Sequence, residues 1–177
     1  MEIPKASALL FYGGTKPTEW VGNRLYHYPY KPPAFHAAFY IQDGLFLNVG
    51  DFRIIQELSL EMRSARRIDV IIFKNISDSV RIQLCNAALL DSSHPKVGLD
   101  LPDYAFTDYL RFGLRFLRPS KKEFCSENVV HLFLKGDIMI SDKLAVDTAP
   151  WDLQTYAETH SESCELRTLW VGPDFHV

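Results

Sequence analysis

The chain has 177 residues, of which 47% are hydrophobic and 23% are charged, and its formal net charge is −3. This length fits one domain with a full core, and this composition excludes an intrinsically disordered chain. The slightly acidic balance excludes a protein that binds nucleic acid through a strong basic field. We therefore expect one globular domain spanning residues 1–177.

The first predicted element is a short buried strand over residues 8–12 (ALLFY), which ends at two glycines. Residues 15–34 hold four prolines and predict a long irregular segment. Long loops of this kind often carry function, and this one is rich in aromatic side chains. If the protein binds a partner protein, we expect residues 15–35 to form the surface.

A hairpin follows, with strands predicted over residues 36–41 and 45–49. Between them stands Asp43-Gly44, a dipeptide typical of a two-residue hairpin turn. The next segment, Ile54 to Arg63, predicts a short helix.

The remaining chain alternates strands and helices. Residues 68–73 (IDVIIF) predict a central strand, and either Ser77 or Asp78 is expected to cap a helix that ends near Leu90. Further elements are predicted as helices from Tyr104 to Leu117, from the capping box Ser120–Glu123 to about Lys135, and from Pro150 to about His160, and as a strand from Leu166 to Val171. The mixed order predicts the α+β class.

Three cysteines, Cys85, Cys125 and Cys164, make an odd number without a close pair, which favours free thiols over a disulfide framework. Cys85 lies on the apolar face of its predicted helix and is expected in the core. The first residues lack the apolar run of a signal peptide, and no stretch approaches 18 apolar residues. We expect a cytoplasmic or virion-associated protein without a transmembrane segment.

Metal ligands are not indicated by the sequence. His160 and Cys164 have Glu158 and Glu162 nearby, but a second Cys/His pair is missing. A solvated C-terminal surface is the favoured interpretation, and we expect neither a metal nor a cofactor.

Cys125 stands at the head of an apolar-periodic segment, KKEFCSENVVHLF, just after Lys121 and Lys122. Unpaired N–H groups in the first turn of a helix stabilise a thiolate, as does positive charge nearby. If Ser120 caps the helix, Cys125 falls in the second turn and this effect is weak. If the helix begins at Cys125, the effect is strongest. The alternative is a buried cysteine that only packs.

A catalytic cysteine also needs a base, and His36 is the best candidate because it opens the predicted hairpin. Asn48 lies twelve residues later on the partner strand, at roughly the same height. The even separation places both side chains on one face, provided that the turn adds no odd offset. The Asn48 side-chain oxygen would then accept a hydrogen bond from the imidazole and fix its tautomer.

Taken in order, FHAAFYIQDGLFLNVGDF and then FCSENVVHLF resemble the circularly permuted NlpC-type papain-like cysteine hydrolases, in particular the YiiX/YebB-like group, with lecithin–retinol acyltransferase as a more distant relative. In that group the histidine comes first on a strand, a polar residue follows on the next strand, and the cysteine arrives late at the head of a helix. The resemblance places His36, Asn48 and Cys125 at these three positions and covers roughly residues 8–155. Asn48 departs from the more usual Glu or His, although papain itself uses an asparagine.

The resemblance implies a papain-like, circularly permuted fold with a central antiparallel sheet or barrel packed by helices and the nucleophile at a helix N-terminus. It implies a thiol-protease type of hydrolase that cleaves amide bonds through an acyl-enzyme, with peptidoglycan stem peptides of the bacterial cell wall as substrate. An enzyme delivered by a phage virion would fit the missing signal peptide. Two alternatives stay open: hydrolysis of a lipid acyl ester, and a non-enzymatic assembly or interaction module.

Overall fold

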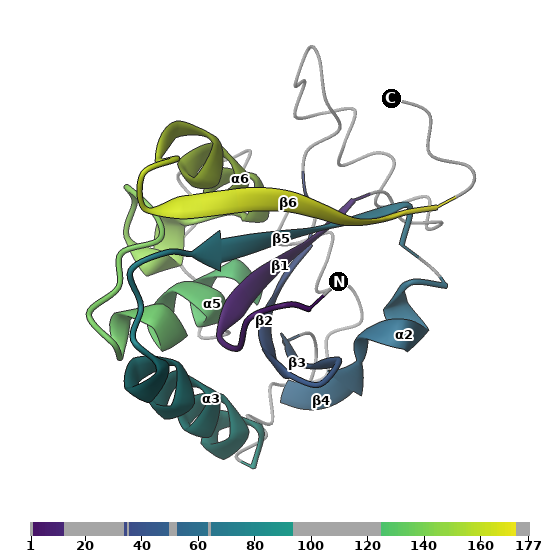
Figure 1. The fold of residues 1–177 in the computed structure, drawn as a ribbon, viewed down its shortest axis with the longest axis horizontal. Coiled ribbons are helices and arrows are strands. Elements are labelled where there is room, and N and C mark those ends of the chain that lie inside the picture. Colours follow the sequence, from purple (N-terminus) through teal and green to yellow (C-terminus); the bar gives the residue numbers. More distant parts are fainter. Residues whose placement is uncertain are drawn as a thin grey trace.

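A six-stranded antiparallel sheet forms the centre of the protein, with the strand order β4-β3-β2-β1-β5-β6 (Figure 1). The computed structural model describes residues 2–12, 34, 36–49, 53–63, 65–93 and 125–172. The strands are β1 (Ser7–Tyr12), β2 (His36–Gln42), β3 (Leu45–Val49), β4 (Arg53–Glu57), β5 (Arg67–Phe73) and β6 (Cys164–Val171). Because β4 and β6 are the two edges and no described pairing joins them, the described sheet is open and is not a closed barrel.

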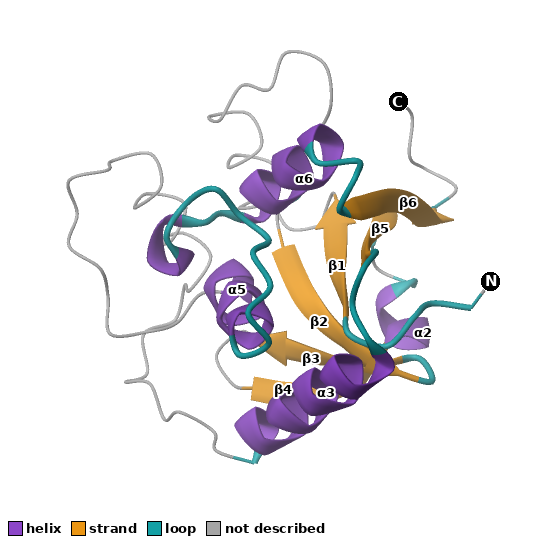
Figure 2. Ribbon diagram, turned by 60° about the vertical axis from the view of Figure 1, so that its left-hand side comes forward, coloured by secondary structure: helices purple, strands orange, loops and turns teal. Residues whose placement is uncertain are grey.

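The helices lie on both sides of this sheet, but unequally. They are α2 (Leu58–Glu61), α3 (Asp78–Ser92), α5 (Cys125–Leu134) and α6 (Pro150–Thr159), with a short 3₁₀ turn, η1, over Ala145–Asp147. Figure 2 shows α3, α5 and α6 together over one face, while α2 lies behind the sheet. Successive side chains of β1 serve the two faces in turn: Leu10 packs in the core under α3, α5 and α6, and Leu9 packs in the core on the α2 side.

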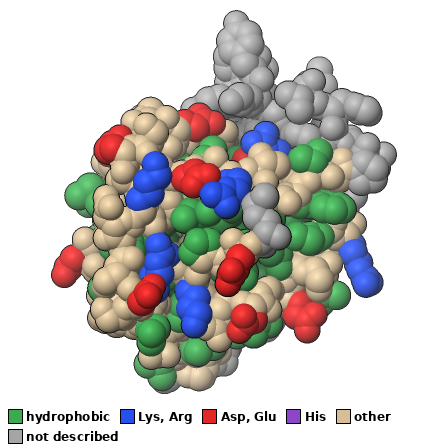
Figure 3. Space-filling model, in the orientation of Figure 1, with side chains coloured by type: hydrophobic (Ala, Val, Ile, Leu, Met, Phe, Trp, Pro, Cys, Tyr) green, Lys and Arg blue, Asp and Glu red, His purple; other side chains and the backbone are tan. Residues whose placement is uncertain are grey.

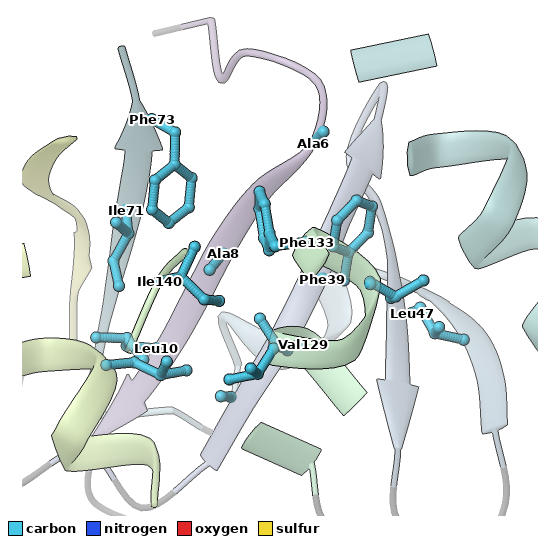
Figure 4. Packing of buried hydrophobic residues seen from close by; sticks show 14 of the residues in the cluster. Ala6, Ala8, Leu10, Phe39, Leu47, Ile71, Phe73, Val129, Phe133 and Ile140 are labelled. Atoms are coloured by element: carbon cyan, nitrogen blue, oxygen red, sulfur yellow. The ribbon is translucent and has the colours of Figure 1, made fainter. Parts of the chain in front are cut away.

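Phe133 of α5 is the aromatic anchor of the larger core. Its ring lies 5.3 Å from that of Phe39 on β2 and 4.6 Å from that of Phe73 on β5, measured between centroids. Figure 4 shows these rings together with Val129 of the same helix, which also points toward the sheet. Since Val129 and Phe133 are four residues apart, they share one helix face. This face fixes α5 against the sheet and thereby positions the start of the helix.

The predicted hairpin is confirmed, and its turn has the expected chemistry. Asp43 and Gly44 have φ angles of 52° and 78°, so both central residues adopt the left-handed region that a type I′ turn requires. The pairing then shifts by one residue between Tyr40 and Gln42, which marks a β-bulge at Ile41.

The prediction of a helix over Ile54–Arg63 is wrong for its first part. Arg53–Glu57 forms β4, which pairs along its whole length with β3, and only Leu58–Glu61 is helical. The isoleucine pair in this segment fits a helix or a strand equally well. The segment forms a strand because its backbone hydrogen-bonds to the edge of β3.

Most other predicted elements agree with the structure. The strands near residues 8–12, 68–73 and 166–171 are confirmed, as is the helix that begins at Pro150. Ser77 is the N-cap of α3, because its hydroxyl accepts a hydrogen bond from the Val80 N–H. The predicted segments that lie outside the described residues are 15–33, the helix from Tyr104 to Leu117, and the capping box Ser120–Glu123.

Acidic and basic side chains are interspersed on the face drawn in Figure 3. No described helix is long and apolar enough to cross a membrane.

Candidate active site

Cys125 is the first described residue of α5, and this helix packs against β2. Among the described residues α5 begins at Cys125, which places the thiol in the first described turn, where backbone N–H groups stabilise an anion. The next residue anchors this turn: the Ser126 hydroxyl is buried and donates to the Thr148 carbonyl at 2.5 Å. The residue Cys125 as a whole is 7% exposed, so the sulfur is largely shielded from bulk water.

His36 is the first residue of β2 and lies opposite Phe11 of β1. The two rings are 5.5 Å apart between centroids, which supports one side of the imidazole. β3 pairs with the other side of β2, and there the His36 ring atom Nε2 lies 2.7 Å from Oδ1 of Asn48. Because an amide oxygen only accepts, Nε2 carries the proton in this contact and Nδ1 is left to face the sulfur.

The structure brings His36 and Cys125 into direct contact, and each changes the pKa of the other. Burial opposes protonation of His36, but the Cys125 thiolate and hydrogen bonds to Cys125 and Asn48 outweigh it and raise the imidazole pKa. Burial likewise opposes ionisation of Cys125. The imidazolium charge, the hydrogen bond from His36 and backbone hydrogen bonds from Ala37 and Ser126 outweigh it and lower the thiol pKa. The pair therefore favours a thiolate and an imidazolium over two neutral groups.

The β-bulge places Asn48 on the same face as His36. The type I′ turn pairs Gln42 with Leu45, and continued without interruption this register would put Asn48 opposite Phe39, on the face away from His36. The bulge consumes one residue of β2, so that Phe39 instead pairs with Leu47. Asn48 then stands diagonal to His36 on one face, within reach of a hydrogen bond. The sequence predicted that His36 and Asn48 share a face provided that the turn adds no odd offset. The turn does add an offset of one residue, and the bulge cancels it.

Gln56 of β4 adds a third side chain to the pair of His36 and Asn48, and it was not among the site residues predicted from the sequence. The Asn48 amide nitrogen Nδ2 lies 2.6 Å from Oε1 of Gln56. A strand prediction over Arg53–Glu57 would have revealed it, since the alternation then turns Gln56 to the face of Phe46 and Asn48.

The two other cysteines have different surroundings. Cys85 is buried in the core as expected, where its Sγ donates to the Ile41 carbonyl at 3.3 Å, and burial raises its pKa. Cys164 is also buried, with its Sγ 3.3 Å from the His160 carbonyl, and burial again raises the pKa. The prediction of a solvated surface is therefore wrong for Cys164. Cys125 differs from both in having a lowered pKa.

Within the described ranges, no group of three or more His, Cys, Asp or Glu side chains is arranged to hold a metal ion. Lys121 and Lys122, which the sequence analysis placed near the thiol, lie outside the described residues.

No protein-family model, curated protein or solved structure matches this chain, so the site is interpreted from its own geometry.

Proposed function

We propose that the protein is a cysteine hydrolase in which Cys125 is the nucleophile, His36 is the general base and acid, and Asn48 orients the imidazole. One observation carries the proposal: a helix-terminal thiol with a lowered pKa contacts an imidazole whose far nitrogen is held by an amide oxygen at 2.7 Å. A nucleophile, a base and an orienting group in this order are the parts that acyl transfer requires.

In the proposed reaction, the Cys125 thiolate attacks the carbonyl carbon of the substrate and forms a tetrahedral intermediate. The oxyanion that develops is stabilised by backbone N–H groups of the first turn of α5. The His36 imidazolium gives its proton to the leaving group, and an acyl-enzyme remains. The neutral imidazole then takes a proton from water, which attacks the thioester. The acyl group leaves as a carboxylic acid, and the thiolate and imidazolium are restored.

The proposed substrate is an amide bond in a peptidoglycan stem peptide. This part rests on the resemblance of the two sequence segments that carry His36, Asn48 and Cys125 to permuted papain-like hydrolases. A lipid acyl ester would undergo the same attack, and hydrolysis of the ester alone would shift the assignment to that class.

Alkylation rates of the three thiols test the nucleophile directly. With iodoacetamide at neutral pH and peptide mapping by mass spectrometry, Cys125 is expected to react at least about tenfold faster than Cys85 or Cys164, because only its pKa is lowered. His36→Ala is expected to remove the difference. Equally slow labelling of all three cysteines in the folded protein would favour a non-enzymatic module.

The substrate requires a separate assay. Purified peptidoglycan is incubated with the wild-type protein and with Cys125→Ala, and the released fragments are identified by mass spectrometry. New stem-peptide fragments that appear only with the wild type are expected. A reactive Cys125 without such fragments would keep the hydrolase and reject this substrate.

A further inference from the structure

The row of side chains that begins at His36 does not end at Asn48. His36, Asn48 and Gln56 come from three adjacent strands, β2, β3 and β4, and each stands diagonal to the next on the same face of the sheet. The two contacts are short, at 2.7 Å between His36 and Asn48 and 2.6 Å between Asn48 and Gln56. The thiol therefore stands at one end of a continuous chain of hydrogen bonds, and Gln56 stands at the other.

An asparagine in the middle of such a chain is ambiguous by itself. Its carboxamide has a donor end and an acceptor end of nearly the same shape, and rotation by half a turn exchanges them. With Oδ1 toward His36, the proton is held on Nε2 and Nδ1 is left to the sulfur. With Nδ2 toward His36, Nε2 would have to accept, and the neutral ring would carry its proton on Nδ1, where it cannot act as a base toward the thiol. An imidazolium would meet an N–H donor and be destabilised.

The contact with Gln56 couples the orientation of Asn48 to that of a second carboxamide, because a half-turn of Asn48 would keep this hydrogen bond only if Gln56 turned as well. Its Oε1 faces Nδ2 of Asn48, and an oxygen acceptor there is compatible only with the amide orientation that turns Oδ1 to the imidazole. We propose that Gln56 is a positioning residue for the active site: its carboxamide oxygen fixes the orientation of Asn48 and, through it, the tautomer of His36.

This inference rests on the proposed function for its catalytic meaning, whereas the orientation itself is measurable without any substrate. Among the described residues, the titratable groups that act on the His36 imidazole are Cys125 from α5 and Glu61 from α2, and both favour its protonated form. A variant at position 56 alters neither of them.

Three variants separate the role of the oxygen from that of the side-chain volume. Gln56→Met keeps the length but lacks the acceptor, Gln56→Glu offers only acceptors, and Gln83→Met on the exposed surface of α3 is the control for loss of a glutamine. Asn48→Ala removes the side chain that holds Nε2 of His36 and therefore gives the effect of losing this hydrogen bond altogether. Thermal unfolding followed by circular dichroism checks that each variant is folded.

The first readout is the rate of Cys125 alkylation as a function of pH. In Gln56→Met, the imidazolium loses support and the thiol pKa rises, so the acidic limb of the profile is expected to move up by about one pH unit, with a rate about tenfold lower near its foot. Gln56→Glu keeps an acceptor and adds a negative charge that favours the imidazolium, so its acidic limb is expected not to move up, and Gln83→Met is expected to change nothing. If Gln56 had a purely structural role, Gln56→Met would lower the thermal stability of the protein but would leave the acidic limb of the alkylation profile in place.

The second readout does not depend on the thiol. In the Cys125→Ala background, the nitrogen chemical shifts of the His36 ring at alkaline pH report its tautomer. The Nε2–H form is expected while Gln56 is present, and a mixture of both tautomers is expected in Gln56→Met. Slow alkylation of the wild type together with this tautomer change would reject the hydrolase but keep the role of Gln56. A folded Gln56→Met variant with unchanged tautomer and unchanged limb would overturn the inference.

Discussion

At the scale of single residues, the site consists of a buried thiol and a half-buried imidazole, each withdrawn from water at a cost to its charged form. Each lowers that cost for the other, because the charge of the thiolate and that of the imidazolium offset the burial of both. Neither residue would have this character alone, as the raised pKa values of Cys85 and Cys164 illustrate. The sequence provided the residue types and their order, but only the contact between them separates a reactive thiol from a packing one.

The pair also makes the stability of the protein depend on pH in a defined way. In the unfolded chain, the pKa values of the His36 imidazole and the Cys125 thiol are about 6.5 and about 8.5. The raised pKa of His36 contributes stability that is complete below the first value and is lost as pH rises through the folded-state pKa. The lowered pKa of Cys125 contributes stability that is complete above the second value and is lost as pH falls through the folded-state pKa.

Between the two unfolded values these trends have opposite signs and cancel, so the contribution of the pair is expected to be level there and to decline on both sides. Urea unfolding of the wild type and of Cys125→Ser over a range of about pH 5 to pH 10 measures this contribution as a difference in the free energy of unfolding. A difference that is constant over the whole range would contradict the ion pair.

At the scale of elements, the hairpin β2–β3 positions the site through its turn. Gly44 has a φ of 78°, and a Cβ added there would meet no atom within 4 Å. The cost of Gly44→Ala is therefore conformational, and we expect a loss of about 1 kcal/mol in the free energy of unfolding. Gly44→Asn is expected to lose less, because asparagine tolerates the left-handed region.

Chemical denaturation of the two variants at neutral pH checks this prediction. Equal losses in Gly44→Ala and Gly44→Asn would indicate that the turn does not require a left-handed residue at this position. Since the substituted position projects into open space, core packing does not confound the comparison.

The elements also show why some features could be predicted from the sequence and others could not. The Asp43-Gly44 turn, the Ser77 cap and the proline at the start of α6 are local signals, and each agrees with the structure. β4 depends on pairing with β3, which no local pattern encodes, and its misassignment hid Gln56. The bulge was not predicted either, although the match of His36 with Asn48 depends on it.

At the scale of the whole molecule, one sheet separates two cores, and β1 contributes to both. Leu9 and Leu10 are both 0% exposed, but they belong to opposite faces. The sequence predicts a single domain over residues 1–177, and a single domain requires that the two cores unfold together.

Leu9→Ala and Leu10→Ala test this cooperativity, since each leaves a cavity in one core only. Each is expected to lower the free energy of unfolding by about 3 kcal/mol. Far-ultraviolet circular dichroism and intrinsic fluorescence are expected to report one coincident transition for each variant. Separate transitions in either variant would show that the faces unfold independently and that the single-domain prediction is wrong.

The bulge at Ile41 has a consequence for how the length of this hairpin can vary. Inserting or deleting one residue within β2 or β3 between His36 and Asn48, while the two-residue turn stays paired as it is, inverts which face Asn48 occupies, unless a second irregularity compensates for it. Changes of two residues preserve the match. Natural variants of this protein that retain the site and the two-residue turn should therefore differ in the length of these strand segments by even numbers, and any that differ by an odd number should carry a second bulge.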